Sequence, residues 1–177
     1  MSTPFDDALA GFRLGESETC LRLDSVEDFN RATLALLRQA RRELRILTPD
    51  FEPERYNTLE FRDALSAFMR RSRHTDTRIL LGDPTIAIRW GHKVVNLARR
   101  MTSRLQLRQL GEEDFRGLRN EAWIVADGIC LLRRDGMDGY AGSLVARSLP
   151  HAPRASQHFL ELWERSGDIP DFRNLDL

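Results

Sequence analysis

Lysine, cysteine and long apolar runs are all scarce in this chain of 177 residues. Lys93 is its single lysine, so arginine supplies nearly all of the positive charge. Cys20 and Cys130 are far apart and have apolar neighbours, so we expect free, buried thiols rather than a disulfide framework. No apolar run approaches the roughly 20 residues that span a bilayer. With an acidic start that lacks the marks of a signal peptide, these features predict a cytoplasmic protein without a membrane span.

Metal-ligating patterns are also missing. There is no C-x-x-C pair, and the only histidine with a second ligand at metal spacing is His158, which precedes Glu161 by three residues. The acidic run at residues 112–114 is typical of a solvated loop. We therefore expect neither a metal site nor a cofactor.

Charge is balanced overall but unevenly distributed. The formal net charge is zero, yet residues 70–108 hold ten basic and two acidic side chains and so carry +8. Arginine can donate two hydrogen bonds at once to a phosphate group. The pattern favours an anion-binding segment, and its candidate residues are Arg89, His92, Lys93, Arg99 and Arg100. The alternative interpretation is a set of ordinary solvated helix faces.

Hydrophobic periodicity predicts an α/β fold with a mixed β-sheet flanked by helices, an α/β/α sandwich. Residues 1–18 show no clean period and are predicted to be a flexible arm, whereas residues 19–177 are predicted to form a single domain. Trp90, Trp123 and Trp163 fall on apolar faces and are assigned to the core. The predicted helices cover residues 25–42, a segment beginning after Thr58, 85–102 and 154–165, and the predicted strands cover 44–48, 77–81, 105–110, 122–126, 129–133 and 140–146.

One segment carries most of the functional information. It reads Asn120-Glu121-Ala122-Trp123-Ile124-Val125-Ala126-Asp127-Gly128, and Ala141-Gly142-Ser143 follows later. The segment is typical of a strand that ends in an Asp-Gly turn. Asp127 is expected to serve that turn, and Gly142-Ser143 is expected to be a close-packed step beside the strand.

This layout resembles the motif of the phospholipase D superfamily, here as one half-domain of a bacterial branch. In that motif a histidine is followed by a lysine two positions on and an aspartate seven positions on, and a Gly-Ser pair comes later. Asp127, Gly142 and Ser143 match, but Asn120 replaces the histidine and Ala122 replaces the lysine. The spacing from Asp127 to Gly142 is longer than in the family. Because two halves of the fold normally pair, the resemblance implies a homodimer.

The missing residues are those that do the chemistry the resemblance implies. Histidine is the nucleophile and lysine neutralises phosphate charge. The amide of Asn120 cannot attack phosphorus, and Ala122 is uncharged. We therefore expect a non-catalytic phospholipase D-like module that binds a phosphate-bearing ligand or serves protein assembly. Two alternatives remain open: a nucleic-acid-binding protein that uses residues 70–108, and an active phosphodiesterase with a relocated nucleophile such as His92 or His151.

Overall fold

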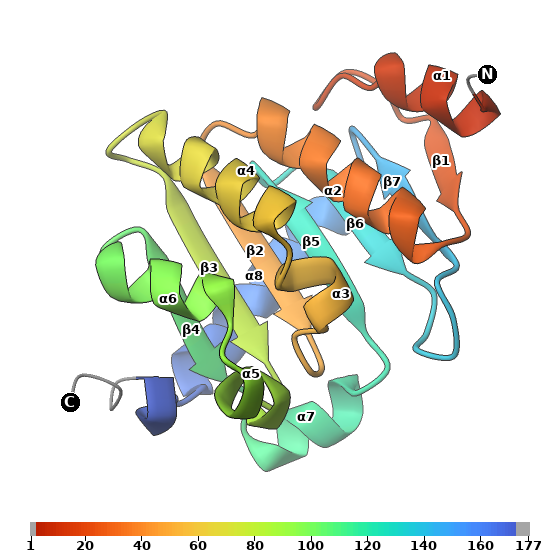
Figure 1. The fold of residues 1–177 in the computed structure, drawn as a ribbon. Helices are drawn as coiled ribbons and strands as arrows, with labels where there is room; N and C mark the ends of the chain where they lie inside the picture. Colours follow the sequence, from red (N-terminus) through yellow and green to blue (C-terminus); the bar gives the residue numbers. More distant parts are fainter. Residues whose placement is uncertain (1–2, 173–177) are drawn as a thin grey trace.

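A seven-stranded mixed sheet forms the centre of the molecule (Figure 1). The structure is a computed structural model, and it describes residues 3–172. The strands lie in the order β1-β7-β6-β5-β2-β3-β4. Their bounds are Cys20–Leu23 (β1), Glu43–Thr48 (β2), Asp76–Leu81 (β3), Leu105–Gln109 (β4), Ala122–Ala126 (β5), Cys130–Arg134 (β6) and Gly142–Val145 (β7).

The sheet has a parallel half and an antiparallel half. Strands β2, β3 and β4 run parallel, because helical crossovers separate them in the chain. Strand β5 pairs antiparallel with β2, and β6, β7 and β1 continue the antiparallel half. As a result, the ends of β2, β3, β4 and β6 lie at the same edge of the sheet as the starts of β5 and β7.

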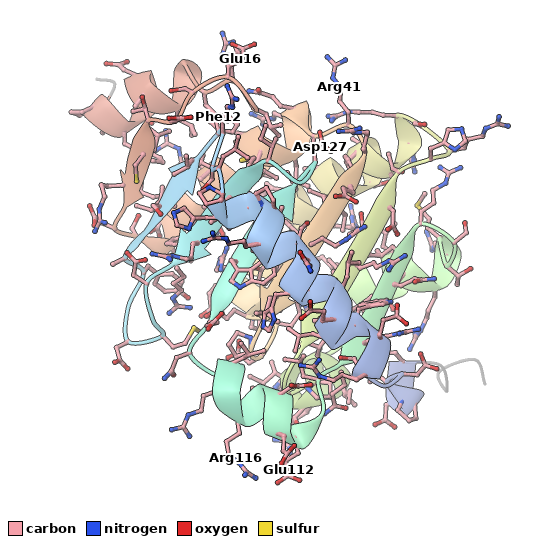
Figure 2. All side chains as sticks on the ribbon, turned by 180° about the vertical axis from the view of Figure 1, so that it is seen from behind. Phe12, Glu16, Arg41, Glu112, Arg116 and Asp127 are labelled. Atoms are coloured by element: carbon pink, nitrogen blue, oxygen red, sulfur yellow. The ribbon has the colours of Figure 1, made fainter. Side chains whose placement is uncertain are left out.

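Helices cover both faces of the sheet. One face carries α2 (Val26–Gln39), α4 (Leu59–Arg70) and α6 (Lys93–Arg100), and the other carries α8 (His151–Arg165), as Figures 1 and 2 show from opposite sides. Alternation along β2 divides its side chains between two clusters: Ile46 packs with the α2 and α4 side, and Leu47 packs with the α8 side. The predicted α/β sandwich is confirmed.

Several local predictions are also confirmed. Ser25 and Thr58 are the N-caps of α2 and α4, and each side chain accepts a hydrogen bond from the third backbone amide of its helix. Trp123 and Trp163 are buried.

The single helix predicted over residues 85–102 is wrong. Gly91, with φ 71°, breaks it into α5 (Thr85–Trp90) and α6. Trp90 lies at the end of the short helix α5 and is 78% exposed, so its assignment to the core is also wrong. The apolar residues keep their helical spacing across Gly91, so the sequence pattern did not reveal that the chain changes direction there.

Several short elements were not predicted. Residues 3–18, which were expected to belong to an arm, include α1 (Pro4–Ala10) with a Thr3–Asp6 capping box, and Phe12 packs into the core. The short helices α3 (Pro53–Tyr56), α7 (Glu112–Leu118) and η1 (Pro170–Phe172) were missed as well.

The two cysteines differ from each other. Cys130 is buried, and burial raises the pKa of its thiol. Cys20 is exposed on the edge strand β1, so its expected burial is wrong.

Among residues 3–172, no helix combines the length and the apolar character that a bilayer span requires.

Candidate functional site

Two of the five motif positions, Ala122 and Gly142, lie on one rung of the sheet, on either side of Arg134. Ala122 pairs with Arg134 on β6, and Arg134 pairs with Gly142 on β7. Asn120 is exposed two residues before β5. We call this place, defined by Asn120, Ala122, Arg134 and Gly142, the motif edge. A cavity of about 430 Å³ lies there, lined by residues 120–123 and 133–136.

Arg134 occupies the centre of the motif edge, and its side chain is only 4% exposed. It forms an ion pair and hydrogen bond with Glu52, whose side chain is 9% exposed. Its guanidinium also donates to the carbonyls of Gly139, at 2.6 Å, and Met137, at 3.1 Å. The ring of Tyr140 lies 4.2 Å from the guanidinium carbon. Arg134 therefore fastens the loop between β6 and β7 to the segment that follows β2.

A second arginine completes this network. Arg55 Nη1 lies 3.9 Å from the same Glu52 carboxylate, and its guanidinium carbon is 4.7 Å from the Phe29 ring centre. Burial raises the pKa of nearby Asp50, and the Glu52 charge raises it further. Beneath the motif edge, Glu52, Arg55 and Arg134 thus form a buried group of charged side chains, with the half-buried Asp50 beside it.

Glu52, Arg55 and Arg134 were not predicted as site residues. A usable signal existed for Arg134, because strand alternation places it on the same face as the buried residues Cys130 and Leu132. An arginine at an inward position requires a buried partner. Nothing local identified Glu52, which is 82 residues away from Arg134 in the chain.

Gly142 has a packing role. A Cβ atom at this position would lie 2.3 Å from the Arg133 carbonyl oxygen and 2.4 Å from the Phe29 ring. Glycine therefore lets β7 approach both β6 and helix α2. Ser143, the next residue, is half-buried on the opposite side of the strand.

Asp127 lies at the other end of β5, away from the motif edge. Its carboxylate accepts three hydrogen bonds, from the backbone amides of Arg41, Arg42 and Glu43, at 2.8 to 3.0 Å. Its φ of 52° is that of a left-handed turn residue. Figure 2 shows Asp127 and Arg41 at one end of the molecule and helix α7, with its labelled Glu112, at the other. Asp127 joins the β5–β6 turn to the start of β2.

His92 is buried rather than available to a ligand. It is the N-cap of α6, and its Nδ1 accepts from the Val94 amide at 3.2 Å. Its ring stacks on Phe51 with 4.0 Å between ring centres. Burial lowers the pKa of His92 to about 4, although the Phe51 backbone opposes this shift, so the imidazole is neutral at pH 7. Nε2 has no hydrogen-bond partner among residues 3–172.

The other candidate anion-binding residues do not form one cluster with His92. Arg99 and Arg100 lie in the last turn of α6, roughly 10 Å along the helix from its N-cap. The Arg99 Nε donates to the Phe172 carbonyl at 2.8 Å. Lys93 begins α6, and Arg89 is exposed on α5.

The basic segment 70–108 is divided between the two faces of the sheet. Arg78 and Arg108 place their guanidiniums 5.4 and 4.6 Å from the ring centre of Trp163, on the α8 face. Arg71 donates to the last carbonyls of α2, and Arg104 donates to the Met69 carbonyl of α4. Much of the local charge excess therefore serves helix ends and the packing of α8.

No group of three His, Cys, Asp or Glu side chains that could hold a metal ion occurs within residues 3–172.

The sheet order, the hairpin that follows β5 and the helices on both faces define an α/β domain with a phospholipase D-like fold, and solved structures support this class. NucT from Helicobacter pylori has a TM-score of 0.62 and 9% identity, with 85% of this chain and 100% of that chain covered. Phosphatidylserine synthase from Haemophilus influenzae Rd KW20 has a TM-score of 0.58 and 11% identity, with 89% and 41% covered. TrmBL2, an archaeal chromatin protein described with a novel mode of DNA binding, has a TM-score of 0.65 and 16% identity, with 88% and 54% covered. The chain thus spans about half the length of TrmBL2.

The chain belongs to the family described as domain of unknown function DUF7931, whose model matches residues 25–175. No curated protein sequence matches it.

Proposed function

We propose that this protein is a non-catalytic phospholipase D-like module that acts by binding at its motif edge. The observation that carries the proposal is the Glu52–Arg134 ion pair, which is buried on the rung shared by Ala122 and Gly142. Arg134 is held by Glu52 and two carbonyls, so it is not free to neutralise a substrate phosphate as a lysine would.

The remaining side chains offer no replacement for the missing nucleophile. Asn120 has no basic lone pair on its amide nitrogen, and Ala122 has no functional group. His92 has its Nδ1 occupied and its ring covered by Phe51, which disfavours a relocated nucleophile there. His151 is exposed in the first turn of α8, on the opposite face of the sheet from α6.

Hydrolysis of bis-p-nitrophenyl phosphate tests the absence of catalysis. We expect release of nitrophenol at the rate of buffer alone, and the same rate for Asn120→Ala and His151→Ala. Turnover that co-purifies with the protein and disappears in either variant would overturn the proposal. Turnover unchanged by both variants and by His92→Asn would identify a contaminating enzyme.

Pairing of two copies through the motif edge is the form of assembly that the fold resemblance favours. Asn120 is exposed there, and Asn120→Arg would place a long charged side chain at the two-fold contact. Sedimentation velocity should show a dimer that becomes a monomer in this variant. A monomer at all concentrations of the unaltered protein would reject pairing and leave ligand binding as the role.

Nucleic-acid binding is the second candidate, and the fold likeness to TrmBL2 favours it. Arg89 and Arg100 are exposed and form no ion pair within residues 3–172, so they are two of the free cations of the basic segment. Fluorescence anisotropy of a labelled oligonucleotide at two salt concentrations tests this function. Binding that weakens steeply with salt, and weakens further in Arg89→Gln/Arg100→Gln, would support it. No binding at low salt would reject it.

A further inference from the structure

A second concave site lies at the end of the molecule opposite the motif edge. This cavity, of about 630 Å³, lies between the segment after α1 and the C-terminal ends of α2 and α4. We call it the arginine pocket. It is lined by Arg13, Leu14, Glu16, Arg38, Gln39, Arg41, Arg71 and Ser72.

Its charge is unlike that of the whole chain. Four arginines and one glutamate give the lining a formal charge of +3, whereas the whole chain has a formal net charge of zero. In Figure 2 the labelled Glu16 and Arg41 lie at this same end. Glu16 is exposed, and no ion pair joins it to any of the four arginines among the described residues. The excess of positive charge in the pocket is therefore not neutralised from within.

Two of the four guanidiniums are fixed in place. Arg71 Nη1 donates to the carbonyls of Leu37 and Ala40, and Arg13 Nη1 donates to those of Ala10 and Phe12. Each is anchored through a single nitrogen, so its other N–H groups remain for a ligand.

The other two guanidiniums, on Arg38 and Arg41, form no hydrogen bond or ion pair within residues 3–172. Favourable interaction with the C-terminal end of a helix explains Arg71, which donates to the last carbonyls of α2. It does not explain two further arginines that lack any such contact. Arg38 and Arg41 are therefore free to bind an anion that Arg13 and Arg71 also contact.

The wall of the pocket is rigid on the α2 side. Gln39 Oε1 accepts from the Leu14 amide and Nε2 donates to the Phe12 carbonyl, both at 2.8 Å. Phe12 itself is 5% exposed and anchors this segment in the core. The spacing between Arg13 and the C-terminal end of α2, where Arg38 and Arg41 lie, is therefore set before any ligand binds.

We propose that the arginine pocket binds a small anion with two or more phosphate groups, of the nucleoside diphosphate or inorganic pyrophosphate class. The +3 lining matches the charge of a diphosphate near neutral pH, and guanidinium forks suit phosphate oxygens. The cavity is in the size range of small-molecule sites and is larger than a single phosphate requires. This proposal does not depend on the function proposed for the motif edge, which lies at the other end of β5.

Isothermal titration calorimetry with pyrophosphate, inorganic phosphate and ADP at low salt tests the proposal. We expect pyrophosphate to bind with a Kd below about 100 µM and phosphate to bind at least about tenfold more weakly, since fewer charge-assisted hydrogen bonds form. ADP binding tighter than pyrophosphate would assign the phosphates to a nucleotide. ADP binding equal to that of pyrophosphate would show that the pocket recognises the diphosphate group alone.

The decisive variant is Arg38→Gln/Arg41→Gln, because both side chains are exposed and free, so the fold is not at risk. It should weaken pyrophosphate binding at least about tenfold. The matched control, Arg119→Gln/Arg154→Gln, removes the same charge from exposed positions elsewhere and should change the Kd less than twofold. Absence of pyrophosphate binding at 1 mM, equal weakening in both variants, or binding of an oligonucleotide alone would overturn the proposal.

Discussion

Arg134→Met should destabilise the protein by about 1–2 kcal/mol more than Glu52→Gln, which neutralises its partner. Arg134→Met leaves the Glu52 carboxylate 9% exposed, with only the Arg55 guanidinium nearby at 3.9 Å. It also leaves the carbonyls of Gly139 and Met137 without their donor. Breaking a buried ion pair from one side typically costs about 3–5 kcal/mol, and we expect about 3 kcal/mol here because Arg55 partly compensates.

Glu52→Gln should cost less. It removes the charge but keeps an amide oxygen that can accept from Arg134, and Arg134 retains its two carbonyls and the Tyr140 ring. We expect a loss of about 1–2 kcal/mol. In Glu52→Gln/Arg134→Met both charges of the pair are removed and only Arg55 keeps a buried charge. The double variant should therefore lose at least about 1 kcal/mol less than the sum of the two single variants.

Urea unfolding measures all three effects. With a slope of about 2 kcal/mol per molar for a domain of this size, Arg134→Met should lower the midpoint by about 1.5 M. The loop between β6 and β7 should also become sensitive to protease in this variant, but not in Glu52→Gln. If the two single losses simply add, Arg134 and Glu52 are not energetically coupled, and the ion pair does not hold the loop between β6 and β7 against the segment after β2.

Three further predictions concern Asp127, His92 and the two tryptophans Trp163 and Trp90. Asp127→Ala should lower the unfolding free energy by about 2 kcal/mol, because three backbone amides of residues 41–43 lose their acceptor, and Asp127→Asn should restore about half of this in urea unfolding. The pKa of His92 is about 4 in the folded protein and 6.5 in the unfolded chain. Between pH 6.5 and pH 4 the unfolded chain therefore binds a proton that the folded protein does not, which lowers stability. Stability should fall by about 3 kcal/mol more in the unaltered protein than in His92→Asn between pH 7 and pH 4, and parallel curves would refute the burial argument. Trp163→Ala should cost about 3–5 kcal/mol and Trp90→Ala less than about 0.5 kcal/mol by the same assay, and a large loss for exposed Trp90 would contradict its placement.

The local order of strands and helices was largely predictable from the sequence. Strand β5, its Asp-Gly turn and the caps at Ser25 and Thr58 depend on neighbours within a few residues, so the pattern along the chain was sufficient. The break at Gly91 was missed because a glycine within a continuing apolar period does not reveal whether its φ will be positive.

The absence of the motif's histidine and lysine was also evident from the sequence, since Asn120 and Ala122 can be identified by spacing alone. The buried Arg134–Glu52 pair at this end of the sheet was not evident from the sequence. Pairing of Arg134 with Glu52 depends on two segments 82 residues apart, and strand pairing decides that Arg134 lies between Ala122 and Gly142.

Where the arginine side chains lie was likewise decided by the tertiary structure. The sequence determined that positive charge gathers in residues 70–108. The fold turned Arg78 and Arg108 toward Trp163 on one face of the sheet, while Arg99 lies on α6 on the other. It also assembled the arginine pocket from three separate segments, two of them outside that run. Charge along a chain is set by composition, but charge on a surface depends on which faces the strands and helices present to solvent.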